Sequence, residues 1–257
     1  MTGTQDIEIS REGAVMSAAF ARPSKKNAIT GAMYESLIEA FEAAERDADI
    51  GAFVLSGKGG VFTAGNDLGD FVALATGAAA ANDGRDFPAG RFTRKLAAFE
   101  KPLVAAVDGL AVGVGTTLLF HCDLVYATPE ARFQTPFVNL GLVPEAGSSL
   151  LAPQRFGHVR AAELLMLAEP LGAEEARALG LVNALVPQGE LLAHAMAKAA
   201  ALAAKPRAAL LATRRLMRGD QEALKARMGE ETHAFSAALA SPEAHAAFRA
   251  FLSGGRK

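Results

Sequence analysis

Residues 107–115 read Val-Asp-Gly-Leu-Ala-Val-Gly-Val-Gly, and this stretch joins the end of an apolar run to a Gly-x-Gly turn. The apolar run at residues 103–107 predicts a buried strand, and the Gly-x-Gly turn after it opens a helix predicted over residues 113–121. The first amides of such a helix have no intrahelical partners and face the turn with the positive end of the helix dipole. Close packing of strand against helix explains the glycines equally well. A dinucleotide-binding fingerprint is weak here because Leu118 occupies its third glycine position.

A second glycine-rich segment covers residues 57–69 and follows a strand predicted at residues 52–56. Its glycines allow a ligand to approach the main chain closely, and amides that point out of such a turn can hold an anion. Taken alone, a plain strand-to-helix turn with Asp67 capping a short helix that starts near Leu68 is the better explanation.

The third segment, residues 141–149, places one carboxylate, Glu145, in an apolar and glycine-rich stretch. Proline followed by glutamate is typical of a helix start, which is the simplest interpretation. In a dry pocket, however, the same carboxyl group would have a raised pKa, which suits a general base. The residues by themselves leave both interpretations open.

Composition excludes several classes of protein. The 257 residues are 51% hydrophobic and 21% charged, and the net charge of -2 provides no basic field for nucleic acid or an acidic membrane. The single cysteine, Cys122, cannot form an intrachain disulfide, and the histidines lack metal-ligand spacing. Residues 1–8 lack the features of a signal peptide and no apolar run is long enough to span a bilayer, so we expect a metal-free cytoplasmic protein.

Along the chain, strand–strand–helix units come first and helices come last. Strands are predicted at residues 7–9, 14–21, 123–127, 132–134 and 182–186, in addition to the two named above. Thr30 is expected to cap a helix whose apolar face is Met33, Leu37, Phe41 and Ala44. Residues 71–90 have no firm period and are predicted to form an irregular segment or marginal helix over a site, and residues 71–95 to line a pocket.

In this order and spacing, the segments resemble the crotonase (enoyl-CoA hydratase/isomerase) superfamily. The matching stretches are Ala-Gly-Asn-Asp-Leu at 64–68, Asp-Gly…Gly-Val-Gly at 108–115, Cys-Asp-Leu-Val-Tyr-Ala at 122–127 and Gly-Leu-Val at 180–182. The resemblance covers nearly the whole chain. It implies an α/β fold: a spiral of strand–strand–helix units over residues 1–195 that binds acyl-CoA, then a C-terminal helical region over residues 196–257 that forms homotrimers or hexamers.

The resemblance also implies the site. It places an oxyanion hole at the backbone amides of Ala64 and Val114, and it requires no cofactor because CoA arrives on the substrate. The residues implied to bind that substrate are Lys26, Ala28, Ala64, Gly65, Asn66, Asp67, Leu68 and Gly113. Thr117 and Phe137 stand where hydratases of the family carry their two catalytic glutamates, and we expect them in the acyl pocket.

The missing glutamates bear on the reaction. Hydration uses the pair, whereas shifting a double bond from C3–C4 to C2–C3 needs one base that removes a C2 proton and returns a proton at C4. Residues 133–149 resemble the peroxisomal-type Δ3,Δ2-enoyl-CoA isomerases, in which the glutamate matching Glu145 is the only acid/base. We therefore predict a Δ3,Δ2-enoyl-CoA isomerase of fatty-acid degradation. Hydration or another crotonase reaction is the first alternative, and a non-catalytic acyl-CoA-binding protein is the second.

Overall fold

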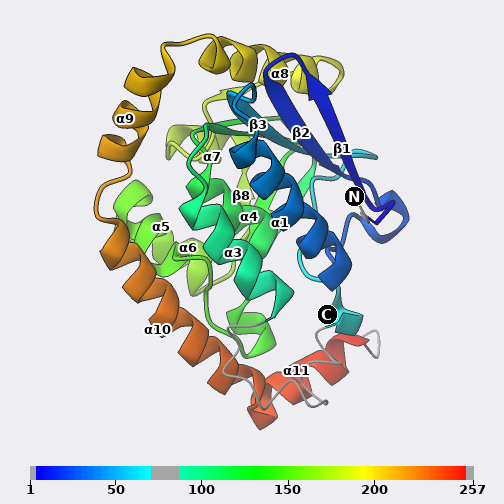
Figure 1. Cartoon of the computed structure of the whole chain (residues 1–257). Coiled ribbons are helices and arrows are strands. Elements are labelled where there is room, and N and C mark those ends of the chain that lie inside the picture. The colour runs from blue at the N-terminus through cyan, green and yellow to red at the C-terminus, as the bar shows by residue number, and fades with distance from the viewer. Residues whose placement is uncertain (1–3, 71–86, 253–257) are drawn as a thin grey trace.

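The computed structural model describes residues 4–70 and 87–252 (Figure 1). Within them, six strands form the main sheet, in the order β1-β2-β3-β4-β6-β9. These strands are β1 Ile7–Glu12, β2 Val15–Phe20, β3 Ala52–Gly57, β4 Leu103–Val107, β6 Leu124–Ala127 and β9 Ala184–Leu185. The β1–β2 hairpin is antiparallel and every later neighbour is parallel.

A smaller sheet lies beside the main one, in the order β5-β7-β8. Its strands are β5 Leu110–Val112, β7 Arg132–Gln134 and β8 Leu171–Gly172. Strand β4 of the main sheet thus leads to β5 of the smaller sheet, and β6 leads to β7. This alternation confirms the predicted α/β fold of repeated strand–strand–helix units, although the short strands β5 and β8 were not predicted.

The helices cover the sheets and then continue alone at the C-terminal end, as Figure 1 shows for α9, α10 and α11. The longer ones are α1 Gly31–Arg46, α3 Pro88–Ala98, α5 Ser148–Phe156, α6 His158–Leu165, α8 Gln188–Ala203, α9 Arg207–Met217, α10 Gln221–Leu239 and α11 Pro242–Leu252. The shorter ones are η1 Pro23–Lys25, α4 Val114–Thr117, η3 Leu118–His121, η4 Val138–Leu140 and α7 Ala173–Ala178. The division of the chain at residues 195/196 stays a prediction, and α8 runs across it.

Both faces of the main sheet are buried at its central strands β3 and β4, which explains why these two strands are continuously apolar. Phe53 and Leu55 of β3 point into the larger core with residues of α1 and α3, whereas Val54 packs against α8. Helix α1 begins where predicted, because the Thr30 hydroxyl accepts the Met33 N–H at 3.3 Å. Its predicted apolar face is buried.

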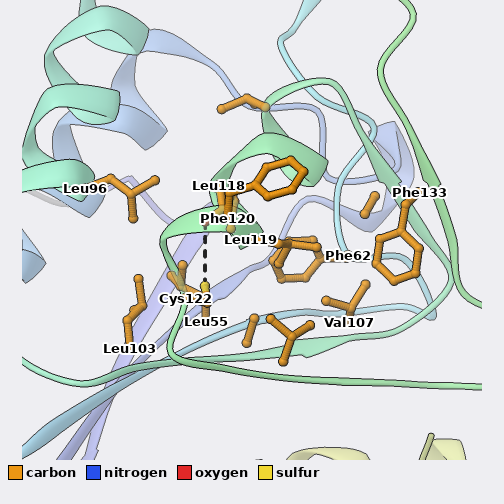
Figure 2. Close-up of a cluster of buried hydrophobic side chains, with 14 of the residues drawn as sticks. Leu55, Phe62, Leu96, Leu103, Val107, Leu118, Leu119, Phe120, Cys122 and Phe133 are labelled. Carbon is orange, nitrogen blue, oxygen red and sulfur yellow. Dashed lines mark hydrogen bonds between the residues drawn. The ribbon is translucent and has the colours of Figure 1, made fainter. Parts of the chain in front are cut away.

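The core beneath the β5–α4 turn holds Leu118, Phe133 and Cys122 (Figure 2). The Cys122 thiol is buried and donates to the Leu118 carbonyl at 3.7 Å. Burial raises the pKa of this thiol, so it stays protonated and unreactive. In the described part of the chain, no helix has the length and apolarity to cross a membrane, and no group of three metal-ligating side chains is present.

Candidate active site

Glu145 lies in a strained turn immediately before α5. Ala146 and Gly147 both have left-handed backbones, with φ values of 59° and 72°. Such a conformation costs of order 1–3 kcal/mol for a residue other than glycine and persists only where its surroundings hold it. Two contacts hold this one: the Ser148 hydroxyl donates to the Glu145 carbonyl at 2.6 Å, and His121 Nε2 lies 2.7 Å from the Ala146 carbonyl. Burial lowers the pKa of His121 to about 4, so the ring is neutral and Nε2–H is the donor.

The turn presents the Glu145 side chain to a cavity of about 700 Å³ between α1, α3 and α10. Most of the wall is apolar, with Ile29, Ala97, Leu224, Met228, Phe235 and Leu239 among its residues. This burial, together with a smaller effect of the negative charge of Glu231, raises the pKa of Glu145 to about 7. Near neutral pH the group therefore exists in both forms, as an acid/base that removes and returns a proton requires.

Thr117 opposes part of this rise. Its buried hydroxyl donates a hydrogen bond to Glu145 Oε1, and this bond favours the ionised carboxylate. Phe137 packs instead with Leu142, Leu239 and Phe248. Neither Thr117 nor Phe137 is among the residues that line the described cavity, and their place in the acyl pocket stays a prediction.

The loop at residues 63–67 leaves one amide free. The N–H of Ala64 donates to the Lys26 carbonyl at 2.9 Å, and the N–H of Asp67 donates to the Ile29 carbonyl at 2.9 Å. The N–H of Gly65 is taken by the Thr63 hydroxyl at 3.1 Å. The amide of Asn66 has no acceptor within the described residues. The prediction of Ala64 as an oxyanion donor is therefore corrected to Asn66, because the Ala64 amide is already used to hold the loop.

The second free amide is the predicted one. Val114 is the first residue of α4, and its N–H has no acceptor among residues 4–70 and 87–252, whereas Gly113 N–H donates to the Gln134 carbonyl at 2.8 Å. The two loops touch, since a Cβ on Gly65 would lie 2.8 Å from the Val112 carbonyl oxygen. Thr117, the residue bound to Glu145, ends the same short helix. Two unpartnered amides and one carboxyl group of tuned pKa are thus brought together.

Residues 10–255 match the family described as enoyl-CoA hydratase/isomerase. The chain belongs to this family. It is 36% identical over 251 residues to enoyl-CoA delta isomerase 2 of Rattus norvegicus, which covers 97% of this chain but 64% of that relative's length. It is 34% identical over 248 residues to 2,3-dehydroadipyl-CoA hydratase of Escherichia coli (strain K12), covering 96% of this chain and 95% of the relative. The solved structure of Pseudomonas aeruginosa OdaA superposes with a TM-score of 0.91 at 42% identity, covering 97% of this chain and 99% of that one.

The other residues expected to bind substrate lie around the same two loops. Asn66 and Asp67 line the cavity, and the side chain of Lys26 is exposed to solvent. Arg22 donates to the Asp67 carboxylate at 2.6 Å and to the Ala28 carbonyl at 3.1 Å, which ties the two segments to each other. The Asp67–Arg22 hydrogen bond lowers the pKa of Asp67. Substrate contacts stay predictions at all the residues named for them: Lys26, Ala28, Ala64, Gly65, Asn66, Asp67, Leu68 and Gly113.

Two residues of the site were not predicted. Tyr34 of α1 lines the cavity and donates its hydroxyl proton to the side-chain oxygen of Asn66. Glu231 of α10 lines the same cavity. Of the segment at residues 71–95, those from 71 to 86 lie outside the described residues, and Phe87, Pro88, Thr93 and Arg94 do line the cavity.

Replacing Thr117 tests the tuning of Glu145. Thr117→Val removes the hydrogen bond that favours the carboxylate, so we expect the pKa of Glu145 to rise and the acidic limb of the activity–pH profile to move to higher pH. Thr117→Ser keeps the hydroxyl and should keep the wild-type profile. Coincident profiles for the valine variant and the wild type would show that this bond does not control the titration.

Proposed function

We propose that this chain is a Δ3,Δ2-enoyl-CoA isomerase, which moves the C3–C4 double bond of an acyl-CoA thioester to C2–C3 in fatty-acid degradation. The observation that carries the proposal is the combination of one carboxyl group with a pKa of about 7, Glu145, with two amides, those of Asn66 and Val114, that have no acceptor in the described part of the chain. The similarity to a rat protein named as an enoyl-CoA isomerase supports the same reaction.

In this mechanism the thioester oxygen accepts hydrogen bonds from the amides of Asn66 and Val114. Negative charge accumulates on that oxygen when the C2 proton leaves, and prearranged donors stabilise it. The ionised form of Glu145 takes the C2 proton and becomes neutral. It then delivers a proton to C4, the double bond forms between C2 and C3, and the carboxylate is regenerated. CoA belongs to the substrate, so the mechanism uses no separate cofactor and no metal.

Hydration is the competing reaction, and the E. coli relative is named as a hydratase. Adding water across the double bond calls for a second group that activates the water. Thr117 and Phe137, at the positions of the family's glutamate pair, cannot act as acid or base. Glu231 reaches the cavity, but its two oxygens already accept three hydrogen bonds. These observations favour isomerisation.

The test is an assay of the purified protein with two substrates of equal chain length, a 3-enoyl-CoA and a 2-enoyl-CoA. We expect the first to be converted to the 2-enoyl thioester and the second to be hydrated slowly or not at all. Efficient hydration of the 2-enoyl thioester would replace the proposal with the hydratase alternative. Tight binding of both thioesters without conversion of either would identify an acyl-CoA-binding protein.

A further inference from the structure

A second buried carboxylate approaches the Glu145 turn from a distant part of the chain. Glu231 lies in the middle of α10, and only 6% of its surface is exposed. Its Oε2 accepts the N–H of Gly147 at 2.6 Å. Its Oε1 accepts both the N–H of Ser149 at 2.9 Å and the Ser149 hydroxyl at 2.5 Å. Glu231 and Glu145 line the same cavity.

The groups held by Glu231 belong to the first turn of α5, directly after Glu145. Amides at a helix start have no intrahelical acceptor, and the positive end of the helix favours a carboxylate there. Helix α10 also packs closely against this turn, since a Cβ on Gly147 would lie 2.4 Å from Leu224 Cδ1 of α10. Helix α10 therefore restrains Gly147 and Ser149, the second and fourth residues after Glu145, and Gly147 has a left-handed backbone.

Glu231 is placed for restraint rather than for proton transfer. Three donors occupy its two oxygens, whereas Glu145 accepts one described hydrogen bond and otherwise faces the cavity. A carboxylate engaged in this way is a poor candidate to exchange protons with a substrate.

We propose that Glu231 is a positioning residue, by which the C-terminal helix α10 clamps the backbone at residues 147–149 and fixes the Glu145 carboxyl group in the cavity. The inference rests on the proposed role of Glu145 as the acid/base. It assigns to the C-terminal helices a part in the chemistry of the same subunit.

The negative charge of Glu231 affects the pKa of Glu145, which a pH profile can measure. It raises the pKa of Glu145, to a lesser degree than burial does. Burial also raises the pKa of Glu231 itself. The hydrogen bonds from residues 149 and 147 and the positive charge of Arg227 lower this pKa and offset part of the rise. Among the described residues, the other titratable and charged groups around Glu145 or on the cavity wall are Tyr34 of α1, His121 of η3, Asp67 and Asp70, Arg94 of α3 and Lys225 of α10.

The experiment is Glu231→Gln, measured by kcat, KM and the pH profile of kcat on the acyl-CoA substrate that the wild type converts. The substitution keeps the shape but removes the charge and turns one acceptor into a donor that faces amide N–H groups. We expect kcat to fall on the order of 10–100-fold with little change in KM, because Glu145 is displaced. We also expect the acidic limb of the profile to move to lower pH, because a negative charge near Glu145 is lost. Glu230→Gln is the matched control, since Glu230 is the neighbouring residue, pairs with Arg227 at 2.8 Å and is exposed.

A folded Glu231→Gln with wild-type kcat and an unmoved profile overturns the inference. If that variant does not fold, Ser149→Ala removes one of the three hydrogen bonds and keeps the charge. It should lower kcat several-fold at unchanged KM, and wild-type kcat in Ser149→Ala would overturn the inference instead. A wild type that converts no 3-enoyl-CoA refutes the proposed function, whereas an active wild type with an unaffected Glu231→Gln refutes the clamp alone.

Discussion

Glu145→Gln should abolish isomerisation and at the same time make the folded chain more stable above pH 7. Glutamine has the same shape and can still accept the hydrogen bond from Thr117, but it cannot take up a proton. General acid–base catalysis contributes roughly 10²–10⁴-fold, and both proton transfers use this one group, so we expect a loss at or above the top of that range. Steady-state kinetics with a 3-enoyl-CoA measure it, and residual activity within tenfold of the wild type would exclude Glu145 as the base.

The stability half of this prediction follows from the raised pKa. Between about 4.5 and about 7 the folded chain keeps a proton on Glu145 that the unfolded chain has lost. The free energy of unfolding therefore decreases as pH rises through this window, by up to about 3 kcal/mol. The glutamine variant has no charge to bury, so it should exceed the wild type in stability at pH 8 and equal it at pH 4. Denaturant unfolding at the two pH values checks this, and equal stability of the two proteins at pH 8 would contradict it.

Val114→Pro should lower kcat by about 10²–10³-fold, the usual value of one oxyanion donor. Val114 is the first residue of α4, a position where proline is well tolerated, and its N–H has no acceptor in the described part of the chain, so no internal hydrogen bond is lost. The preceding residue is Gly113, which lacks the Cβ that would clash with the proline ring.

Val114→Ala is the matched control for the proline variant. It shortens the same side chain, which is 1% exposed, but keeps the N–H. The ratio of kcat between the alanine and proline variants therefore isolates the amide from the packing. Equal kcat in two folded variants would show that this amide does not stabilise the transition state.

The strands and the two glycine turns could be predicted because their signals are local. Strand β4 is a continuous apolar run, and the Gly-x-Gly turn after β5 marks the start of α4. The choice between Ala64 and Asn66 could not be predicted in the same way. It depends on the carbonyl of Lys26, on another segment, which takes the Ala64 amide. Sequence spacing predicts a loop with exposed amides, but it does not show which of these amides donate hydrogen bonds within the protein.

Glu231 was missed although the sequence contains a signal for it. Leu224, Met228 and Phe235 recur at helical spacing in the sequence, and Glu231 stands on the same face, three residues after Met228. A carboxylate on a buried helix face needs hydrogen-bond or ionic partners, so a glutamate at such a position indicates a specific contact with another part of the chain. Its partners, Gly147 and Ser149, lie more than eighty residues earlier, so the sequence could mark the residue but not its role.

A crystal structure of Glu145→Gln with a 3-enoyl-CoA bound would show whether the two amides and residue 145 act on the same thioester. We predict the thioester oxygen roughly 2.7–3.1 Å from the amide nitrogens of both Asn66 and Val114. Residue 145 should face C2 and C4 of the acyl chain, and the chain should run along the wall formed by α3 and α10. A thioester oxygen bound away from these amides, or residue 145 directed away from the acyl chain, would contradict the account.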